Sequence, residues 1–424
     1  MQEITLRTEA WYKDQSYNIQ FPESWDVRVL GDQRMPALEP ERIKQIISHP
    51  VGSPSLDVIA HPGSRVAIII DDLTRPTPVQ LPIKLVVEVL EQAGVPTESI
   101  TIVIGSGSHL PPSENDLEIK LGADTLSRLK VINHDCFDNL VDLGKTSRGT
   151  PLFINKDVME SDLRIGIGCI YPHPAAGFSG GSKIIAPATA GAETIRYMHD
   201  HLRTADRRAG SMDTEFRHEI EEIADRIGLD YVINVVLNQE REIAGMFCGD
   251  KLLAHRNGIE FAIKHYSVSP INDADIVVAD MYPFDIDLQF AYDRGFWPLI
   301  RARSDATKVI LAACPNGLGS HKLYPISMSL FQRYTQRLKK LHWRDLRAPV
   351  DRVKKMRRLY RQKSLEYMMV STGVDKKELK SVFPNARLYR SWDKLLGDLV
   401  QNHKPISTKV AVYRCAPFLI PAAE

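Results

Sequence analysis

Three things are scarce in this chain of 424 residues: cysteine, a surplus of charge of either sign, and long apolar runs. The five cysteines are scattered and none forms a C-x-x-C pair, which argues against a zinc cluster and favours reduced thiols. The formal net charge of +1 gives no electrostatic reason to expect nucleic acid or an anionic membrane as a partner. The N-terminus lacks a signal-peptide core, and no apolar run approaches the ~18 residues of a membrane span. We therefore expect a soluble, cytoplasmic protein.

What the chain has instead is a repeated alternation of short apolar segments with helical patterns. Such alternation is typical of α/β folds with mostly parallel sheets. The length exceeds what one ordinary hydrophobic core organises. We predict two α/β domains with a cleft between them. Residues 1–270 would form the cofactor-binding and catalytic domain and residues 271–405 the second domain, and the tail, 406–424, could return to the first domain.

Three apolar segments in the first half predict buried strands, at residues 65–70, 100–104 and 163–170. Each is followed by a polar loop rich in glycine or proline, with the sequences DDLTRPTP, GSGSHLPP and YPHPAAGFSGGSK. Ligands of open α/β sheets bind outside the carboxyl ends of the strands. If the three strands share one sheet, their loops open on the same edge, and we expect a site there.

Two of these loops carry a histidine, His109 and His173, and the first carries Asp72 and Arg75. Imidazole titrates near neutral pH, so two histidines on opposite sides of a substrate suit proton exchange on both faces of one carbon. Arg75 can bind a carboxylate with two parallel hydrogen bonds, and Asp72 can orient an imidazole. A salt bridge between Asp72 and Arg75 within the turn is the alternative for that pair.

The third loop ends on Lys183, but it is not a Walker phosphate loop. Ser182 stands where the last glycine of that motif should be, and Ile184 where the metal-binding hydroxyl should be. The amides of small residues before a helix can still hold an anion. Those residues are Ser179, Gly180, Gly181 and Ser182. The lysine itself is either an anion partner or, if desolvated, a nucleophile that takes a covalent cofactor.

Two more histidines, His199 and His201, follow on a predicted helix. Residues at i and i+2 do not share a helical face, so at most one of the two would be a metal ligand.

Together these loops resemble the nickel-pincer lactate racemase family. The resemblance spans most of the chain and is strongest from Asp71 to His199. It rests on DDLTRPTP, GSGSHLPP, PHPAAGFSGGSK and the step from Lys183 to His199. It implies a nickel pincer nucleotide, in which a pyridinium-3-thioamide-5-thiocarboxylic acid mononucleotide holds nickel through two sulfurs and one carbon. The thioamide would be covalently tethered to Lys183, and His199 would be the protein ligand of the metal.

The resemblance also implies a reaction, the racemisation or epimerisation of a 2-hydroxy acid. His109 and His173 would be the acid/base pair, supported by Asp72 and Arg75. One histidine would take the hydroxyl proton while the α-hydrogen leaves as hydride to the cofactor. The resulting 2-keto acid would then turn and receive the hydride on its other face. The enzymes that synthesise the cofactor would be partners for maturation.

The chain departs from the family pattern in its second half, where it reads DIDLQFAYDR over residues 285–294. Gln289 and Arg294 are the expected substrate contacts in this stretch. The departure allows a substrate other than lactate, such as a larger, aromatic or polyhydroxylated 2-hydroxy acid.

Two further hypotheses fit the same residues. One is a metal-free isomerase or lyase that uses His109 and His173 as its only acid and base. The other is a non-catalytic protein that binds a nucleotide-like anion through Lys183.

Overall fold

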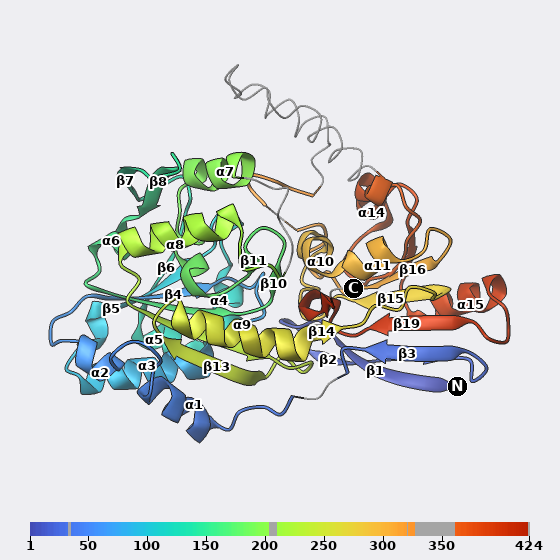
Figure 1. The fold of residues 1–424 in the computed structure, drawn as a ribbon, viewed down its shortest axis with the longest axis horizontal. Helices are drawn as coiled ribbons and strands as arrows, with labels where there is room; N and C mark the ends of the chain where they lie inside the picture. The colour runs from blue at the N-terminus through green and yellow to red at the C-terminus, as the bar shows by residue number, and fades with distance from the viewer. Residues whose placement is uncertain (33–34, 203–209, 320, 327–360, 423–424) are drawn as a thin grey trace, which may run out of the picture. The chain divides into compact units, whose positions relative to one another are not determined.

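The computed structural model describes residues 1–32, 35–202, 210–319, 321–326 and 361–422, and it divides into two compact α/β units (Figure 1). The central unit spans Gln33–Ser267. The terminal unit combines Met1–Asp32 with Val268–Glu424. The predicted fold class, α/β with mostly parallel sheets, is confirmed for both units.

The division of the chain differs from the expected one at both ends. The first 32 residues pack with the second half of the chain, and the tail forms a strand of the terminal unit. That strand, β19 (Lys409–Tyr413), pairs in parallel with β15 (Ile276–Asp280) on one side and β3 (Asp26–Leu30) on the other. The expected return of the tail to the first domain is not found, since apolar periodicity does not say which sheet a strand joins.

The central unit is organised by a six-stranded sheet that is parallel except at one edge. In spatial order its strands are β13 (Ile243–Gly249), β12 (Tyr231–Leu237), β9 (Leu163–Cys169), β4 (Val66–Asp71), β5 (Ile100–Gly105) and β6 (Lys130–Asn133). Every residue of β4 is buried, as expected for a central parallel strand that helices cover on both faces. Only β13 runs antiparallel, against β12.

Helices and small ribbons surround this sheet. The helices are α1 (Pro40–Ser48), α2 (Leu56–Ile59), α3 (Gln80–Gln92), η1 (Thr97–Ser99), α4 (Glu114–Leu121), α5 (Ala123–Arg128), α6 (Lys156–Glu160), η2 (Gly181–Ile184), α7 (Ala192–His201), α8 (Glu215–Ile227) and α9 (Leu253–Tyr266). The two hairpins are β7 (Leu140–Lys145) with β8 (Pro151–Asn155), and β10 (Pro172–His173) with β11 (Gly177–Phe178). As Figure 1 shows, α7 lies beside β8. α9 packs against β12 and β13.

The terminal unit has a fully parallel six-stranded sheet of its own. Its strands, in spatial order, are β18 (Arg387–Tyr389), β17 (Met368–Val370), β16 (Thr307–Leu311), β15, β19 and β3. Its described helices are α10 (Leu288–Gly295), α11 (Trp297–Arg301), α14 (Lys376–Val382), α15 (Trp392–Asn402) and η4 (Ala416–Phe418). The remaining short strands are β1 (Gln2–Thr8), which pairs with β2 (Gln15–Phe21), and β14 (Ser267–Val268), which pairs with β20 (Ile420–Pro421). Apolar side chains pack on both faces of the sheet.

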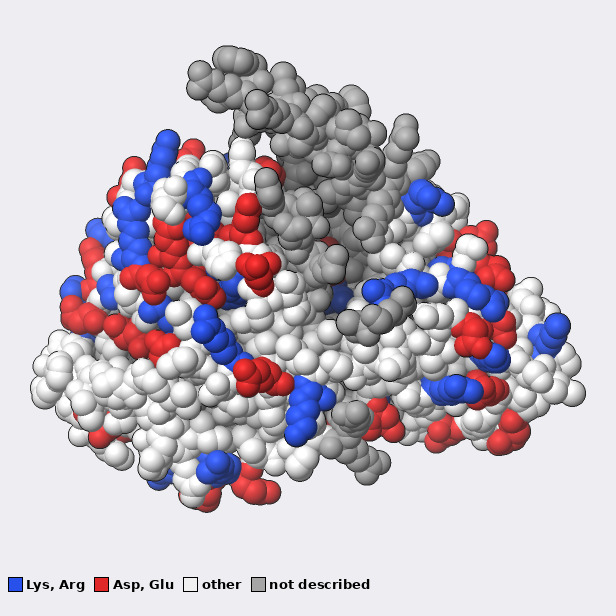
Figure 2. All heavy atoms as spheres, viewed as in Figure 1, with Lys and Arg blue, Asp and Glu red and all other residues white. Residues whose placement is uncertain are grey.

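Acidic and basic side chains are interspersed on the face drawn in Figure 2, in keeping with the near-zero net charge. Among the residues that the structure describes, no helix is both long enough and apolar enough to cross a membrane.

Candidate active site

The three polar loops leave the central sheet at its carboxyl edge from neighbouring strands. β4 lies between β9 and β5, and the register pairs Asp71 with Gly105 and Ile70 with Ile167. The loops after β5 and η2 are also bonded to each other, since the amide of Gly107 donates to the carbonyl of Ala188 at 2.8 Å. The expected convergence of the loops is therefore present in the sheet.

Asp72 and His109 form the centre of this edge. His109 Nδ1 lies 2.7 Å from Asp72 Oδ2, and the amide of Thr74 donates to Asp72 Oδ1 at 3.0 Å. Since a carboxylate only accepts hydrogen bonds, Nδ1 carries the proton and the lone pair of the neutral imidazole is on Nε2. His109 is thus oriented as a base by its carboxylate.

Charge and burial set the protonation of the pair. Burial alone would raise the pKa of Asp72, but His109 and Arg75 outweigh it, so the pKa lies well below its usual range. Burial lowers the pKa of His109, and the nearby charges of Arg75 and Lys183 lower it further, against the opposing effect of Asp72. At neutral pH the pair is therefore a carboxylate beside a neutral imidazole that can accept a proton.

Thr74 connects these groups to Arg75. Its hydroxyl hydrogen-bonds to Asp72 Oδ1 and accepts a hydrogen bond from Arg75 Nη1 at 2.6 Å. In the predicted alternative, Asp72 and Arg75 form a salt bridge. In the structure the Asp72 carboxylate binds His109 and Thr74, and the Arg75 guanidinium binds the Thr74 side chain.

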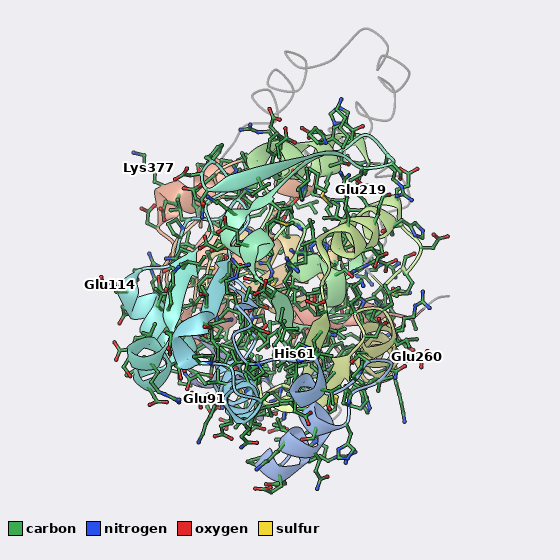
Figure 3. All side chains as sticks on the ribbon, turned by 90° about the vertical axis from the view of Figure 1, so that its left-hand side faces the viewer. His61, Glu91, Glu114, Glu219, Glu260 and Lys377 are labelled. Carbon is green, nitrogen blue, oxygen red and sulfur yellow. The ribbon has the colours of Figure 1, made fainter. Side chains whose placement is uncertain are left out.

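A buried lysine that the sequence pattern did not predict binds the loop after β4. Lys120, 1% exposed at the end of α4, lies 2.8 Å from Asp71 Oδ1 and donates to three loop carbonyls. Those carbonyls belong to Asp72, Arg75 and Thr77. Glu114, the first residue of the same helix, is exposed at the surface (Figure 3). Burial lowers the pKa of Lys120 and raises that of Asp71, so each group depends on the other to remain charged.

His173 follows β9 on the short β10–β11 hairpin and is buried. Its Nδ1 accepts hydrogen bonds from the amides of Ala175 and Ala176 at 3.2 and 3.1 Å. Because amide groups only donate, Nδ1 is unprotonated and the proton of the neutral ring is on Nε2. The tautomer of His173 is therefore opposite to that of His109.

The turn before Lys183 depends on two glycines with positive φ, Gly180 at +78° and Gly181 at +57°. The amide of Gly181 donates to Asn234 Oδ1 at 2.7 Å, and a Cβ at that position would lie 2.7 Å from the ring of His255. Only glycine fits here, because both the backbone angle and the available space exclude a side chain.

The serines of this turn differ in their environment. Ser179 Oγ accepts from the amide of Tyr171 at 3.0 Å and donates to the carbonyl of Cys169, so its side chain closes the loop. Ser182 is 1% exposed, and its hydroxyl has no hydrogen-bond partner within the described ranges. Lys183 is half-buried and close enough to His109 to lower its pKa.

His199 lies in the last turn of α7, where its Nδ1 is 2.8 Å from the carbonyl of Ile195. The carbonyl accepts the Nδ1 proton, which places the lone pair on Nε2, the form in which histidine binds metals. His201 instead stacks on Tyr197, with ring centroids 4.4 Å apart. The two side chains thus have different neighbours, and His199 as the metal ligand stays a prediction. Among the described residues, no three His, Cys, Asp or Glu side chains cluster to hold a metal ion.

The two expected substrate contacts, Gln289 and Arg294, lie on α10 of the terminal unit. Gln289 is 5% exposed, and its Nε2 donates to Asp293 at 2.9 Å. Its Oε1 is buried without a hydrogen-bond partner in the part of the chain that the structure describes.

Two buried carboxylates lie near the carboxyl edge of the terminal sheet, Asp280 and Asp285. Asp280 accepts from the amides of Tyr282 and Cys415, both at 3.1 Å, and Asp285 accepts from the amide of Glu9 at 2.7 Å. Burial raises the pKa of Asp280 to about 7 and also raises that of Asp285. Backbone amides of the chain itself therefore cap these acids.

Comparison with known proteins identifies the family. Residues 12–211 match the profile of the lactate racemase N-terminal domain. The lactate racemase of Lactiplantibacillus plantarum is 30% identical over 293 residues, which cover 68% of this chain and 69% of that protein. The lactate racemase of Thermoanaerobacterium thermosaccharolyticum is 28% identical over 302 residues, or 69% and 70% of the two chains.

Solved structures show the same fold. The lactate racemase apoprotein of T. thermosaccharolyticum superposes with a TM-score of 0.74 at 23% identity, covering 99% of this chain and all of that one. A Thermotoga maritima protein of solved structure gives a TM-score of 0.67 at 18% identity, covering 90% of this chain and 98% of that one. Since the sequence match to the L. plantarum enzyme spans two thirds of both chains, this chain belongs to the lactate racemase family.

Proposed function

We propose that the protein is a racemase or epimerase of 2-hydroxy acids that works with a nickel pincer nucleotide. Lactate racemases are isomerases, and the relatives support this class of activity on lactate-like substrates. The observation that carries the proposal is the Asp72–His109 pair, with Arg75 and Lys183 close enough to change the pKa of its imidazole. This arrangement supports His109 as a base, Arg75 as the cation for a substrate carboxylate and Lys183 as the amine for a covalent tether.

The residues present fit the cofactor. Lys183 follows a glycine turn, and the hydroxyl of the preceding Ser182 is buried without a hydrogen-bond partner among the described residues. His199 has the tautomer that leaves Nε2 able to bind a metal, and a soft sulfur-rich complex with one imidazole suits nickel. Lys183 would hold the nucleotide covalently and His199 would hold the nickel. When bound, the cofactor would supply an acceptor for the α-hydrogen as hydride and return it to either face of the carbon.

The protein's own groups handle the substrate's proton and charge. His109 Nε2 takes the hydroxyl proton, and the Asp72 carboxylate stabilises the imidazolium that results. Arg75 binds the substrate carboxylate, and its hydrogen bond to Thr74 fixes the guanidinium beside the base. His173 acts on the substrate oxygen from the other side, with the proton on its Nε2.

Gln289 and Arg294, on α10 of the terminal unit, stay predicted substrate contacts. The buried Oε1 of Gln289 has no hydrogen-bond donor within the described ranges. Arg294, half-buried on the same helix, would add a second cation for a carboxylate or for further hydroxyl groups. The substrate class is therefore lactate or a larger 2-hydroxy acid.

The test uses protein produced together with the cofactor-synthesis enzymes. We expect a mass increase on Lys183, bound nickel, and racemisation within a panel of 2-hydroxy acids, followed by polarimetry and deuterium exchange. Lys183→Ala should lose all three. Racemisation by Lys183→Ala at the parent rate would contradict the covalent tether.

One observation favours a second candidate, a metal-free isomerase. The Asp72–His109 pair is complete as an acid–base pair without any metal. Activity of protein made without nickel and without the cofactor-synthesis enzymes would support this candidate. An unchanged optical purity for the whole panel, together with Lys183-dependent anion binding, would instead indicate a non-catalytic protein.

A further inference from the structure

The two histidines of the candidate site are held in opposite tautomers. The hairpin that carries His173 is hydrogen-bonded by the start of α8, about forty residues later in the sequence. His109 Nδ1 donates to a carboxylate, whereas His173 Nδ1 accepts from two amides. A neutral imidazole with a lone pair on Nε2 would need a proton on Nδ1, where it would face those two amide protons. As held, His173 is a hydrogen-bond donor through Nε2.

The peptide group that donates to His173 is itself hydrogen-bonded on its other side. The amide of Ala176 and the carbonyl of Ala175 belong to one peptide unit, and Thr214 Oγ1 donates to that carbonyl at 3.3 Å. The hydrogen bonds therefore run in series from Thr214 through the peptide to His173 Nδ1. Hydrogen bonds in series polarise and strengthen one another in a low-dielectric interior.

Arg217, three residues after Thr214 in the sequence, binds the same hairpin. Its Nε donates to the carbonyl of Ala176 at 3.2 Å, and its Nη2 donates to the carbonyl of Phe178. Thr214 is the N-cap of α8, where its hydroxyl accepts from the amide of Arg217 at 3.0 Å. The start of α8 thus holds the hairpin on both sides of Gly177. Figure 3 labels Glu219 on this helix.

This helix end brings a buried positive charge to the hairpin that carries His173. Arg217 is 1% exposed, and burial lowers its pKa to about 10, which still leaves it charged at neutral pH. The charge of Glu221 opposes this lowering of the pKa, but across the described ranges no carboxylate forms an ion pair with Arg217. A helix N-terminus adds a further positive partial charge. A buried cation without a carboxylate partner is costly, which argues that its place beside the hairpin has a function.

We propose that Thr214 and Arg217 are positioning residues that hold His173 as a neutral imidazole with its proton on Nε2. The catalytic meaning rests on the proposed function: His109 is the base, and His173 donates a hydrogen bond to the substrate oxygen. The two histidines are therefore unequal in the resting protein, which refines the symmetric acid/base pair that the sequence predicts.

The experiment records ¹⁵N–¹H correlation spectra of the full-length apoprotein labelled at its 13 histidines. The resonances of His173 are identified as those lost in His173→Gln. In the parent we expect Nδ1 to resonate as an unprotonated acceptor and Nε2 as a protonated nitrogen. Thr214→Val should shift His173 Nδ1 toward the averaged position of an exposed imidazole, and Thr214→Ser should restore the parent position.

Arg217→Lys should produce a shift of the same direction, because a lysine cannot bind two carbonyls with a fixed fork. Arg164→Lys is the matched control, since Arg164 also donates to two carbonyls of the central unit, those of Val158 and Met159. It should leave His173 unchanged, and in every variant the resonances of His109 should report an intact fold.

A protonated Nδ1 on His173 in the parent would overturn the proposal. An unmoved His173 signal in both Thr214→Val and Arg217→Lys would overturn it as well. No nickel is needed for these spectra, so they separate this inference from the proposed function. A Lys183-dependent racemase with the wrong His173 tautomer would refute the positioning role alone.

Discussion

The carboxyl edges of the two parallel sheets show how the same architecture is used in two ways. At the central edge the acids Asp71 and Asp72 bind side chains from other elements, namely Lys120 and His109. At the terminal edge Asp280 and Asp285 bind backbone amides. A carboxylate held by an imidazole can take part in proton transfer, whereas one capped by its own chain mainly fixes loops. A buried Asp at a strand end therefore indicates a catalytic or binding site only when titratable or cationic side chains contact its carboxylate.

The largest effect should come from removing the proposed base at the central edge, His109. His109→Gln should lower the racemisation rate of the cofactor-loaded protein by about 10²–10⁴-fold, the usual contribution of a general base. The thermal unfolding midpoint should change little, because the ring is not part of a hydrophobic core. Chiral chromatography of the product measures the rate.

The control for this variant is His61→Gln, which changes an exposed histidine outside the candidate site (Figure 3). It should keep the parent rate. Equal rates for His109→Gln and the parent would contradict the proposal that the central edge, unlike the terminal edge, takes part in proton transfer.

The next effect concerns stability at the central edge. Lys120→Met should lower the free energy of unfolding by about 3–5 kcal/mol, because it leaves the Asp71 carboxylate buried without its partner. Adding Asp71→Asn should recover part of the loss, since no charge then remains buried. Urea unfolding followed by circular dichroism measures both. If Lys120→Met were as stable as the parent, the hydrogen bonds of Lys120 would not stabilise the loop after β4.

At the terminal edge, Asp280 should make the free energy of unfolding depend on pH. The folded-state pKa of Asp280, about 7, lies above its ordinary value of 3.8. The stabilisation from the neutral acid is thus complete below about pH 4 and is lost as the pH rises toward 7. The loss at pH 7 is on the order of 4 kcal/mol. Asp280→Asn, which mimics the neutral form, should flatten this part of the stability profile.

That profile comes from urea unfolding at several pH values, with racemisation assayed in parallel. We expect the activity of Asp280→Asn to match that of the parent at each pH. A slope identical to the parent's would show that Asp280 is not the titrating group.

The sequence predicted the central edge well because its signals are local. Apolar runs marked the strands, and glycine- and proline-rich loops marked the strand ends. The residue pattern was therefore enough to place Asp72, His109 and His173 after neighbouring strands of the sheet, while their roles stay predictions. It was not enough for Lys120, because nothing in the pattern of α4 shows that a lysine near its end reaches a loop more than forty residues earlier. Burial of a charged group is decided by tertiary partners, which periodicity does not contain.

Arg217 was missed for a different reason, since a signal was present. It lies on the buried stripe of α8 with Ile220, Ala224 and Ile227, at helical spacing. An arginine on an apolar stripe is unusual and indicates a buried polar contact. Which contact it makes depends on the β10–β11 hairpin, and this could only be learned from the structure.

The pairing of β19 with β3 has a consequence for how the protein forms during synthesis. β3 is an edge strand whose neighbour in the sheet is β19, and β19 also pairs with β15. On a ribosome, residues 26–30 emerge early but have no sheet to join until residues 409–413 follow. The central unit, encoded without interruption between them, can fold first. The order of translation thus favours a folded central unit, with its sheet edge complete, before the chain's two ends meet.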